Sequence, residues 1–394
     1  MTVWEQILDR PRQWRGRHWF FQLHLWAGVL TALYLVVASV TGSLLMLHDL
    51  LEPPVPHADV ARGELPVGPD EALRALRAAL PGFRAASVVV PERPGGPYGG
   101  FLLNRGQWAF AEVHPVTGEI SRVITRRNSG WRFLEDLHNN LLSGRTGRVV
   151  NGIGGLSVTL LCVTGIVIWW RGRGLWGRGL RIDWSAPWPR RWWDLHGATG
   201  IWLLPLTLLI TITGVYHTWP LWFRTPIAAV LPVSPPEPQQ HLADAAGRPP
   251  ARIETLLAAA RAAVPHKRVH TLQLPAGSTQ PVRALMLGEG ERIQAFADVV
   301  FLHPATGEVV RIDRYAGRPV GDRAIRWLGI LHGGRFAGAL SGVLWFIVGF
   351  AMAVLAASGV VVWWNRTIRK RLWRLAPPWP FAPRTRCGSP PRRT

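Results

Sequence analysis

The stretch from Trp19 to Leu47 reads WFFQLHLWAGVLTALYLVVASVTGSLLML, and the stretch from Trp192 to Trp219 reads WWDLHGATGIWLLPLTLLITITGVYHTW. Both exceed the roughly 20 apolar residues that a helix needs to cross a bilayer. At an offset of 172 residues, the Leu-His pair at His24 aligns with the one at His196, and Thr41-Gly42 aligns with Thr213-Gly214. Matching polar residues at matching depths indicate that the chain contains an internal repeat.

Two more apolar stretches, Val149 to Trp170 and Phe336 to Trp364, match each other at an offset of 194 residues. Between the paired stretches, the turn sequence HPVTGE at 114–119 matches HPATGE at 303–308. Each half of the chain therefore predicts a helix, a folded domain and a second helix. The fold class that follows is an α-helical membrane protein, with four transmembrane helices in two tandem repeats and two α+β domains on the outer face.

Short helices and strands are predicted in both outer domains. Asp70 is expected to cap a helix through Leu80, and Ile253 to Val264 repeats its apolar pattern. Short runs rich in β-branched and aromatic residues, bounded by Pro or Gly, predict the strands. The predicted strands are 86–90, 99–103, 108–113, 119–124, 269–274, 282–287, 293–302 and 309–312. The Pro-rich stretches 53–56 and 232–238 are predicted to be stiff linkers.

The resulting domain boundaries follow the chain from end to end. They are a cytoplasmic N-terminus 1–18, transmembrane helix 19–48, outer domain 49–136, outer His segment with transmembrane helix 137–171, cytoplasmic loop 172–191, transmembrane helix 192–219, outer domain 220–330, outer His segment with transmembrane helix 331–364, and basic tail 365–394.

Basic residues are unevenly distributed along the chain. The N-terminus, the connection from Arg171 to Arg191 and the tail together hold 19 of the 45 Lys and Arg but 3 of the 24 acidic residues, which is a net charge of +16 against +5 elsewhere. Lys and Arg concentrate in short cytoplasmic segments of membrane proteins. We therefore expect a multi-pass membrane protein with both termini in the cytoplasm. This distribution argues against nucleic acid as a partner. The partner that we expect from it is membrane lipid.

The first apolar stretch is predicted to be an anchor and not a cleaved signal peptide, because it is long and lacks a convincing small-residue cleavage site. Cys162 lies inside the second span and Cys387 in the tail, so neither a disulfide framework nor thiolate metal chemistry is expected.

Ionisable residues within membrane spans are rare and are candidates for function. His24 and His196 occupy equivalent places, and one helical turn later each is followed by a glycine, Gly28 or Gly200. Such a glycine leaves room beside the imidazole for a flat ligand or a close helix. Two histidines facing a gap between helices are the ligands that a six-coordinate haem requires.

Four more histidines, His48, His217, His138 and His332, mark the outer ends of the spans. His138 and His332 each precede a Trp-Trp pair by 32 residues, about 48 Å of helix. They are therefore expected outside the hydrocarbon unless the helix breaks or tilts strongly. All six histidines are candidate haem ligands, and interfacial polar residues are the alternative for each. The Thr-Gly or Ser-Gly pairs at 41, 164, 213 and 358 are interpreted as helix-packing devices, because small residues let membrane helices approach closely.

The combined motifs resemble a known family, the PepSY-associated transmembrane proteins. They are Leu-His with a glycine four residues later in the first span, Leu137-His138, Thr164-Gly165 with Trp169-Trp170, Asp194-Leu195-His196 and Leu331-His332-Gly333. The resemblance implies that the outer domains are periplasmic PepSY modules. It also implies an iron-regulated protein of the bacterial inner membrane, a group that includes reductases that release iron from ferric siderophores in the periplasm with b-type haem. By position, His24, His196, His138 and His332 would be the haem ligands, with His48 and His217 as further candidates.

The sequence thus predicts transmembrane electron transfer through two b-type haems, one between His24 and His196 and one between His138 and His332. The electron donor is expected to be a separate cytoplasmic reductase or a quinol, and the acceptor a periplasmic ferric siderophore. The distance between the sites is a difficulty, because His24 and His48 are about 36 Å apart along one helix. The rival hypothesis is a non-enzymatic PepSY module that binds or restrains a periplasmic peptidase or another partner.

Overall fold

The computed structural model describes residues 2–51, 66–93, 95–235, 242–289, 291, 293–369 and 371. The predicted linker 53–56, part of the linker 232–238, Cys387 and the basic tail beyond residue 371 lie outside the described residues.

Four long apolar helices form the membrane-spanning part, as predicted. They are α2 (Gly16–Met46), α6 (Gly144–Trp169), α7 (Trp188–Thr218) and α11 (Gly338–Trp363), which continues into the π-turn η5 (Trp364–Ile368). Each is long and apolar enough to cross a membrane. Large apolar side chains such as Leu30, Leu33 and Leu340 are more than three-quarters exposed, as expected for helices that contact lipid. The chain is therefore a multi-pass membrane protein.

The four spans form a closed ring in which each helix packs against two others. Helix α2 packs on α6 and α11, and α7 packs on the same two helices. The shorter elements around them are α1 (Val3–Asp9), α3 (His48–Leu51), α8 (Pro220–Val230) and η1 (Trp176–Leu180). A ring of four helices leaves space along its axis, and the candidate site lies there.

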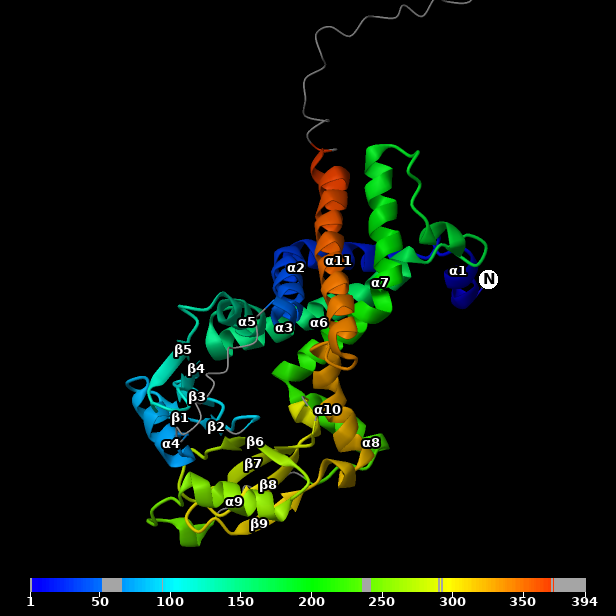
Figure 1. Cartoon of the computed structure of the whole chain (residues 1–394). Helices are drawn as coiled ribbons and strands as arrows, with labels where there is room; N and C mark the ends of the chain where they lie inside the picture. The colour runs from blue at the N-terminus through cyan, green and yellow to red at the C-terminus, as the bar shows by residue number, and fades with distance from the viewer. Residues whose placement is uncertain are drawn as a thin grey trace, which may run out of the picture.

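Below the helices in Figure 1 lies one antiparallel sheet to which both halves of the chain contribute. The strands of the first half are β1 (Arg84–Ala85), β2 (Ser87–Val89), β3 (Tyr98–Asn104), β4 (Gln107–Val113) and β5 (Ile120–Ile124). Those of the second half are β6 (Arg268–Gln273), β7 (Val282–Leu287), β8 (Asp298–Leu302) and β9 (Val309–Asp313). The order is β5-β4-β3-β2-β6-β7-β8-β9, with β1 beside β3.

The two halves meet where β2 pairs with β6, with Val88 opposite Leu272. Counted from the central pair outward, β2, β3, β4 and β5 of the first half correspond to β6, β7, β8 and β9 of the second. The two halves are therefore related by an approximate twofold axis through this pair. Helices α4 (Pro69–Ala78) and α9 (Ile253–Ala263) cover one face, and their leucines, including Leu76 and Leu256, share a single core with both halves of the sheet. Burial of this common apolar face stabilises the two halves together.

Two details differ from the sequence prediction. Asp70 does not cap its own helix, which begins after Gly68; its carboxylate instead accepts hydrogen bonds from the backbone N–H groups of Ile253 (2.7 Å) and Glu254 (3.4 Å) at the start of α9. The predicted strand 293–302 begins with a 3-10 turn, η3 (Gln294–Phe296), before β8. Two further 3-10 turns are η2 (Ala243–Ala245) and η4 (Tyr315–Gly317).

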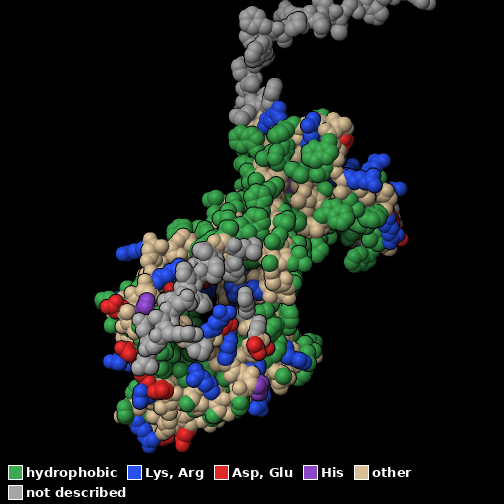
Figure 2. Space-filling view, viewed as in Figure 1, with side chains coloured by type: hydrophobic (Ala, Val, Ile, Leu, Met, Phe, Trp, Pro, Cys, Tyr) green, Lys and Arg blue, Asp and Glu red, His purple; other side chains and the backbone are tan. Residues whose placement is uncertain are grey.

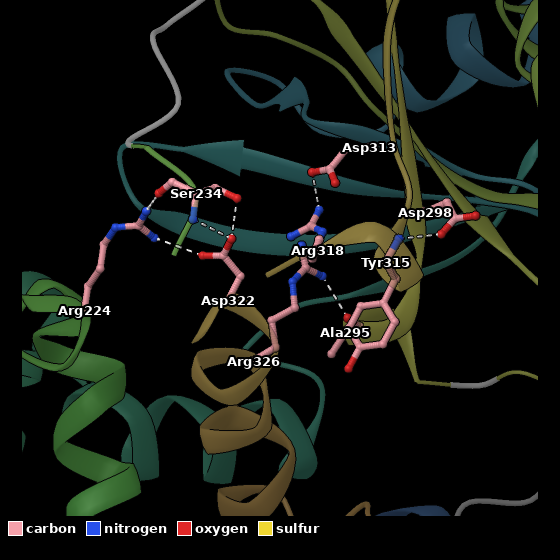
Figure 3. Close-up of polar contacts among 9 residues, drawn as sticks. All are labelled: Arg224, Ser234, Ala295, Asp298, Asp313, Tyr315, Arg318, Asp322 and Arg326. Atoms are coloured by element: carbon pink, nitrogen blue, oxygen red, sulfur yellow. Dashed lines mark hydrogen bonds and ion pairs between the residues drawn. The ribbon is translucent and has the colours of Figure 1, made fainter. Parts of the chain in front are cut away.

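A short helix follows the last strand of each half and leads back to the membrane. These helices are α5 (Gly130–Asn140) after β5 and α10 (Val320–His332) after β9. Polar contacts tie α10 to its surroundings, as Figure 3 shows: Asp322 accepts a hydrogen bond from the backbone N–H of Ser234 (3.0 Å) and pairs with Arg224, and Arg326 donates to the Ala295 carbonyl (2.7 Å). These contacts fix the orientation of α10, whose last residue is His332.

Candidate cofactor-binding cavities

The histidines that the repeat pairs are brought together inside the helix ring. The rings of His24 on α2 and His196 on α7 have centroids 6.3 Å apart. Those of His138 at the end of α5 and His332 at the end of α10 have centroids 6.1 Å apart. Each pair takes one ring from each half of the chain. The structure thus reproduces the predicted pairs, and ligation itself stays a prediction.

Each pair lies in the wall of its own cavity. The first cavity, of about 690 Å³, contains His24 and His196 and is lined by all four spans, with Gly28 and Gly200 in its wall. The second cavity, of about 910 Å³, contains His138 and His332 and lies nearer the sheet. Both volumes fall within the range of about 300–1,000 Å³ that is typical of cofactor sites.

In the first cavity, a hydroxyl on a neighbouring helix holds each imidazole. The Nδ1 atom of His24 lies 2.9 Å from the Thr164 hydroxyl oxygen on α6. The Nδ1 atom of His196 lies 3.0 Å from the Ser358 hydroxyl and 3.2 Å from the Leu355 carbonyl oxygen on α11. Both hydroxyls donate their own protons to helix carbonyls one turn earlier, so they accept from the imidazoles.

The second cavity repeats the arrangement on the other two helices. The Nδ1 atom of His138 lies 3.0 Å from the Ala38 carbonyl oxygen and 3.2 Å from the Thr41 hydroxyl on α2. The Nδ1 atom of His332 lies 3.0 Å from the Ile210 carbonyl oxygen and 3.3 Å from the Thr213 hydroxyl on α7. Four histidines therefore share one mode of attachment.

A glycine follows each of these hydroxyl residues and makes room for the ring. A Cβ atom would lie 3.4 Å from Cε1 of His24 at Gly165, 3.1 Å from that of His196 at Gly359, 2.8 Å from that of His138 at Gly42 and 3.1 Å from that of His332 at Gly214. A Cβ atom at 2.8 Å would overlap the ring. The Thr-Gly and Ser-Gly pairs are thus packing devices, as the sequence indicated, but what they pack against are the histidines.

These contacts determine which ring nitrogen carries the proton. A carbonyl oxygen and a hydroxyl that already donates elsewhere can only accept, so Nδ1 is the protonated nitrogen. In the part of the chain that the structure describes, no hydrogen bond uses Nε2 of His24, His138, His196 or His332. Histidines that bind metals commonly donate through one nitrogen to a carbonyl while the other nitrogen binds the metal.

The ring spacing fits a pair of axial haem ligands. An imidazole nitrogen binds a transition metal at about 2 Å, with about 1 Å more to the ring centre, so two rings on one iron have centroids about 6 Å apart. The observed separations of 6.3 and 6.1 Å agree. Among the described residues, no group of three or more His, Cys, Asp or Glu side chains is placed to hold a metal ion by itself. Paired histidines beside a cavity instead suit a metal whose other ligands come from a macrocycle.

Glycines facing the first cavity add to this fit. A Cβ atom on Gly28 would meet Leu161 at 3.8 Å, and one on Gly200 would meet Leu355 at 3.7 Å, which are ordinary contact distances. Packing within the protein therefore does not demand glycine at either position. Their absent side chains widen the cavity one turn from His24 and His196, as the sequence predicted.

The exception stated for His138 and His332 applies, because the chain breaks between each of these histidines and the following span. Leu141 and Leu142 adopt left-handed conformations (φ 48° and 59°) between α5 and α6. This break turns α5 back against α2, where Thr41 lies five residues before the end of the helix, about 8 Å along its axis. The second half has a corresponding break, with Gly334 and Gly338 in left-handed conformations.

The break also shortens the distance between the sites. The ring of His138 is level with Ala38 to Gly42 on α2, which places it about 21 to 27 Å along the helix axis from His24. The length predicted from the sequence for the helix between His24 and its outer end at His48 is about 36 Å. Leu35, Val158 and Met352 line both cavities. One layer of side chains therefore separates the two cavities.

His48 and His217 also line the second cavity, but in different surroundings. The ring of His217 lies 5.1 Å from that of His332 and 5.3 Å from that of Tyr216. The ring of His48 lies 5.2 Å from that of Trp131 on α5. Neither ring lies against the glycine of a Thr-Gly or Ser-Gly pair, which we call a cradle, so the contacts shared by the other four histidines do not extend to these two.

Arginines gather at the mouth of the first cavity. Asp194, which is 4% exposed, pairs with Arg190 (2.9 Å) and Arg171 (3.5 Å). The Arg366 guanidinium lies 4.3 Å from the ring centroid of Phe21. With one carboxylate among several guanidinium groups, this end of the cavity is positively charged.

Comparison with known proteins adds the family. A family model described as the PepSY-associated TM region matches residues 21–366. The chain is also similar to the Uncharacterized protein PA4219 of Pseudomonas aeruginosa, with 34% identity over 127 residues. That similarity covers 31% of this chain and 30% of that protein. The family match, in contrast, runs from the first turns of α2 past the end of α11 and includes both histidine pairs, so the chain belongs to the PepSY-associated transmembrane family.

Proposed function

We propose that this protein binds two b-type haems, one in each cavity, and passes electrons across the membrane to a ferric complex on the sheet side. The observation that carries the proposal is the spacing of the two histidine pairs, 6.3 and 6.1 Å between ring centroids. In each of the four rings Nδ1 is hydrogen-bonded to a Thr or Ser hydroxyl, which leaves Nε2 for the iron. A ferric siderophore is the proposed substrate, as the resemblance to the family implied.

Haem held by two imidazoles supplies reversible one-electron chemistry and has no open coordination position, which suits electron passage more than oxygen chemistry. The residues of the chain supply the rest. Hydroxyl and carbonyl groups orient the four imidazoles, and the four packed helices surround the space between them. Leu35, Val158 and Met352 form the contact between the cavities across which an electron would travel.

The charge distribution supports a direction for the electrons. Among the described residues, arginines of the N-terminus, of the connection between α6 and α7 and of the turn after α11 line the first cavity, whereas the second cavity reaches the sheet. Figure 1 shows the sheet at one end of the helices. The positive-inside rule then puts the first cavity toward the cytoplasm of a bacterium and the sheet in the periplasm. A separate cytoplasmic reductase or a quinol would donate one electron for each ferric ion reduced.

The direct test is the absorbance spectrum of the purified full-length protein, oxidised and after reduction with dithionite. We expect the spectrum of b-type haem with two haems per chain. His24→Ala and His196→Ala should each remove the haem of the first cavity, and His138→Ala and His332→Ala that of the second, because a single remaining imidazole holds haem weakly.

His114→Ala is the matched control, because His114 lies at the turn between β4 and β5, and it should retain both haems. His217→Ala should also retain both. A folded protein that stays colourless when haem is supplied would contradict the proposal and favour the non-enzymatic PepSY module. Loss of haem in His217→Ala but not in His138→Ala would mean that the ligand pair of the second cavity is wrong.

A further inference from the structure

The second cavity has a wall that the first lacks, because it reaches the sheet. Phe101 on β3 and Trp108 and Phe110 on β4 line it, and we call these three side chains the aromatic wall. Phe101 packs 5.1 Å from Phe110 and 6.4 Å from Trp108, ring centroid to ring centroid. Phe101 is 42% exposed and Trp108 is 43% exposed. Large aromatic side chains are thus presented to open space beside the histidines.

The second half of the sheet is closed at the corresponding positions. By strand register, Leu285, Ala297 and Val299 take the places of Phe101, Trp108 and Phe110. All three are less than 9% exposed. Over this region η3 and α10 pack together, with the ring centroids of Phe296 and Trp327 5.7 Å apart. The approximate twofold symmetry is therefore broken: one half covers its sheet with its own helix, and the other leaves an aromatic surface open.

Positive charge faces the aromatic wall from the membrane side. Arg148 at the start of α6 and Arg335 after α10 line the same cavity. Within the described chain neither forms an ion pair, whereas Arg132 is paired with Glu135 (2.7 Å) and Asp136 (3.2 Å). Two uncompensated guanidinium groups thus lie beside the cavity. Figure 2 shows the molecule hollowed between its membrane-spanning part and its sheet, with Lys and Arg side chains at the rim.

The aromatic wall is additional to what a histidine pair needs. The first cavity holds its own histidine pair, His24 and His196, with the same kind of hydroxyl and glycine contacts, and at about 690 Å³ it has no residue of the sheet in its lining. The second cavity is larger, at about 910 Å³, and gains its extra lining from β3, β4 and α5. The cavity thus extends from the histidine pair to the sheet, and its additional lining lies at the sheet end.

We propose that this part of the second cavity binds an anionic ferric chelate whose iron ligands are aromatic, such as catecholates or phenolates. The inference rests on the proposed function for the role of the chelate as electron acceptor, and the binding itself can be measured without electron transfer. Aromatic ligands can stack on Trp108 and Phe101, and their negative charge is complementary to Arg148 and Arg335. A neutral trihydroxamate chelate has neither property and should bind weakly.

The test measures binding of redox-inert gallium(III) chelates to the full-length, haem-loaded protein in nanodiscs of neutral lipid by isothermal titration calorimetry. The anionic gallium tris-catecholate should bind at least about tenfold more tightly than a neutral gallium trihydroxamate. Trp108→Ala should weaken tris-catecholate binding about tenfold, the usual size of one aromatic stacking contact. Arg335→Gln should weaken it about fivefold.

Matched controls make the same changes away from the cavity. Trp184→Ala removes an exposed tryptophan in the connection between α6 and α7, and Arg105→Gln removes a charge at the β3–β4 turn. Both should bind the chelate as the unmodified protein does. Haem content should remain at the unmodified level in all four variants, because none of these residues cradles a histidine.

Three results would overturn the proposal. They are equal affinity for the two chelates, unchanged affinity in Trp108→Ala and Arg335→Gln, or a phospholipid retained in the cavity in place of the chelate. If Arg335→Gln lowered both the haem content and the affinity for the chelate, this arginine would be assigned to the haem. That result would also count against the proposal. A colourless protein that still binds tris-catecholate through Trp108 would contradict the proposed electron transfer but not the chelate site.

Discussion

At the scale of single residues, a hydroxyl residue and the glycine after it act together on each imidazole. The hydroxyl of Thr41 accepts from Nδ1 of His138, and Gly42 leaves space for the ring beside the helix. The hydroxyl fixes the tautomer and the glycine fixes the distance. Either one alone would leave the direction of Nε2 undetermined.

The steric half of this arrangement can be tested with Gly42→Ala. The added methyl group would lie 2.8 Å from Cε1 of His138 and should push the ring out of place. We expect the haem of the second cavity to be lost or bound at least about tenfold more weakly, while that of the first remains. Haem content per chain and the reduced spectrum measure this.

Gly130→Ala is the control, because nothing lies within 4 Å of a Cβ atom at the start of α5. Alanine favours a helix more than glycine does, so loss of haem in Gly42→Ala would not reflect weaker helix formation. Unchanged haem content in Gly42→Ala would show that the ring of His138 is not held as described.

The sequence predicted the histidines of the site but not their supports. The repeat pairs His24 with His196 and His138 with His332, because equivalent residues of two related units meet near a symmetry axis. The contact of His24 with Thr164 joins residues of two different helices that are 140 positions apart. Neither periodicity nor the repeat offset encodes such a contact, so the Thr-Gly pairs could only be interpreted as general packing.

At the scale of elements, the break between α5 and α6 determines where the second cavity forms. Asn151 on α6 donates from Nδ2 to the His138 carbonyl (2.7 Å) at the end of α5. The Tyr34 hydroxyl on α2 donates to Asn151 Oδ1 (2.8 Å) and to its backbone carbonyl (2.9 Å). Three helices are joined through one amide, which holds His138 at its depth.

Asn151→Leu keeps the size of the side chain and removes its polar contacts with Tyr34, His138 and Asn139. We expect a loss of about 1 to 3 kcal/mol in stability, because the Tyr34 hydroxyl loses a partner and the end of α5 is freed. The haem of the second cavity should dissociate faster than that of the first. Thermal unfolding followed by haem absorbance measures both effects.

Ser157→Ala is a suitable comparison, since the Ser157 hydroxyl donates only within its own helix, to the Ile153 carbonyl (3.0 Å). Its two haems should dissociate as they do from the unmodified protein. Equal loss of both haems from Asn151→Leu would point to general destabilisation and against a local role at the break.

Most elements followed from local sequence, and the exceptions have a common cause. The four spans and the short strands match their hydrophobic patterns, because those patterns are set by neighbours along the chain. The left-handed residues at the break are Leu141, Leu142 and Gly144; the glycine is a local signal for such a conformation, but the two leucines give none. Tertiary contacts such as that of Asn151 stabilise the break, and local patterns do not contain those contacts.

At the scale of the whole molecule, the pairing of β2 with β6 makes one sheet from two outer domains. Ser87 lies opposite Gln273 and Val89 opposite Thr271 across this junction. The repeat predicted two similar domains but not that an edge strand of each would pair with the other. An unpaired edge strand exposes hydrogen-bonding groups, and the pairing removes one edge from each half.

A cross-link can test the junction. Ser87→Cys combined with Gln273→Cys places two thiols on directly opposed residues, which are about 4.5 to 5.5 Å apart between Cα atoms in antiparallel pairs. We expect a disulfide that joins the two halves, detected as linked fragments after proteolysis between them. Ser121→Cys with Gln273→Cys should form no such link, because Ser121 lies on β5 at the far edge of the sheet.

The symmetric origin of each histidine pair has a consequence for chains half this length. Both cavities take one imidazole from each half, so a single unit of helix, domain and helix contains half of each site and neither one complete. Such a unit could assemble both cavities only as a homodimer, with its twofold axis where the approximate axis runs here. Joining the two copies in one chain fixes their stoichiometry, and it lets the aromatic wall exist on one side only.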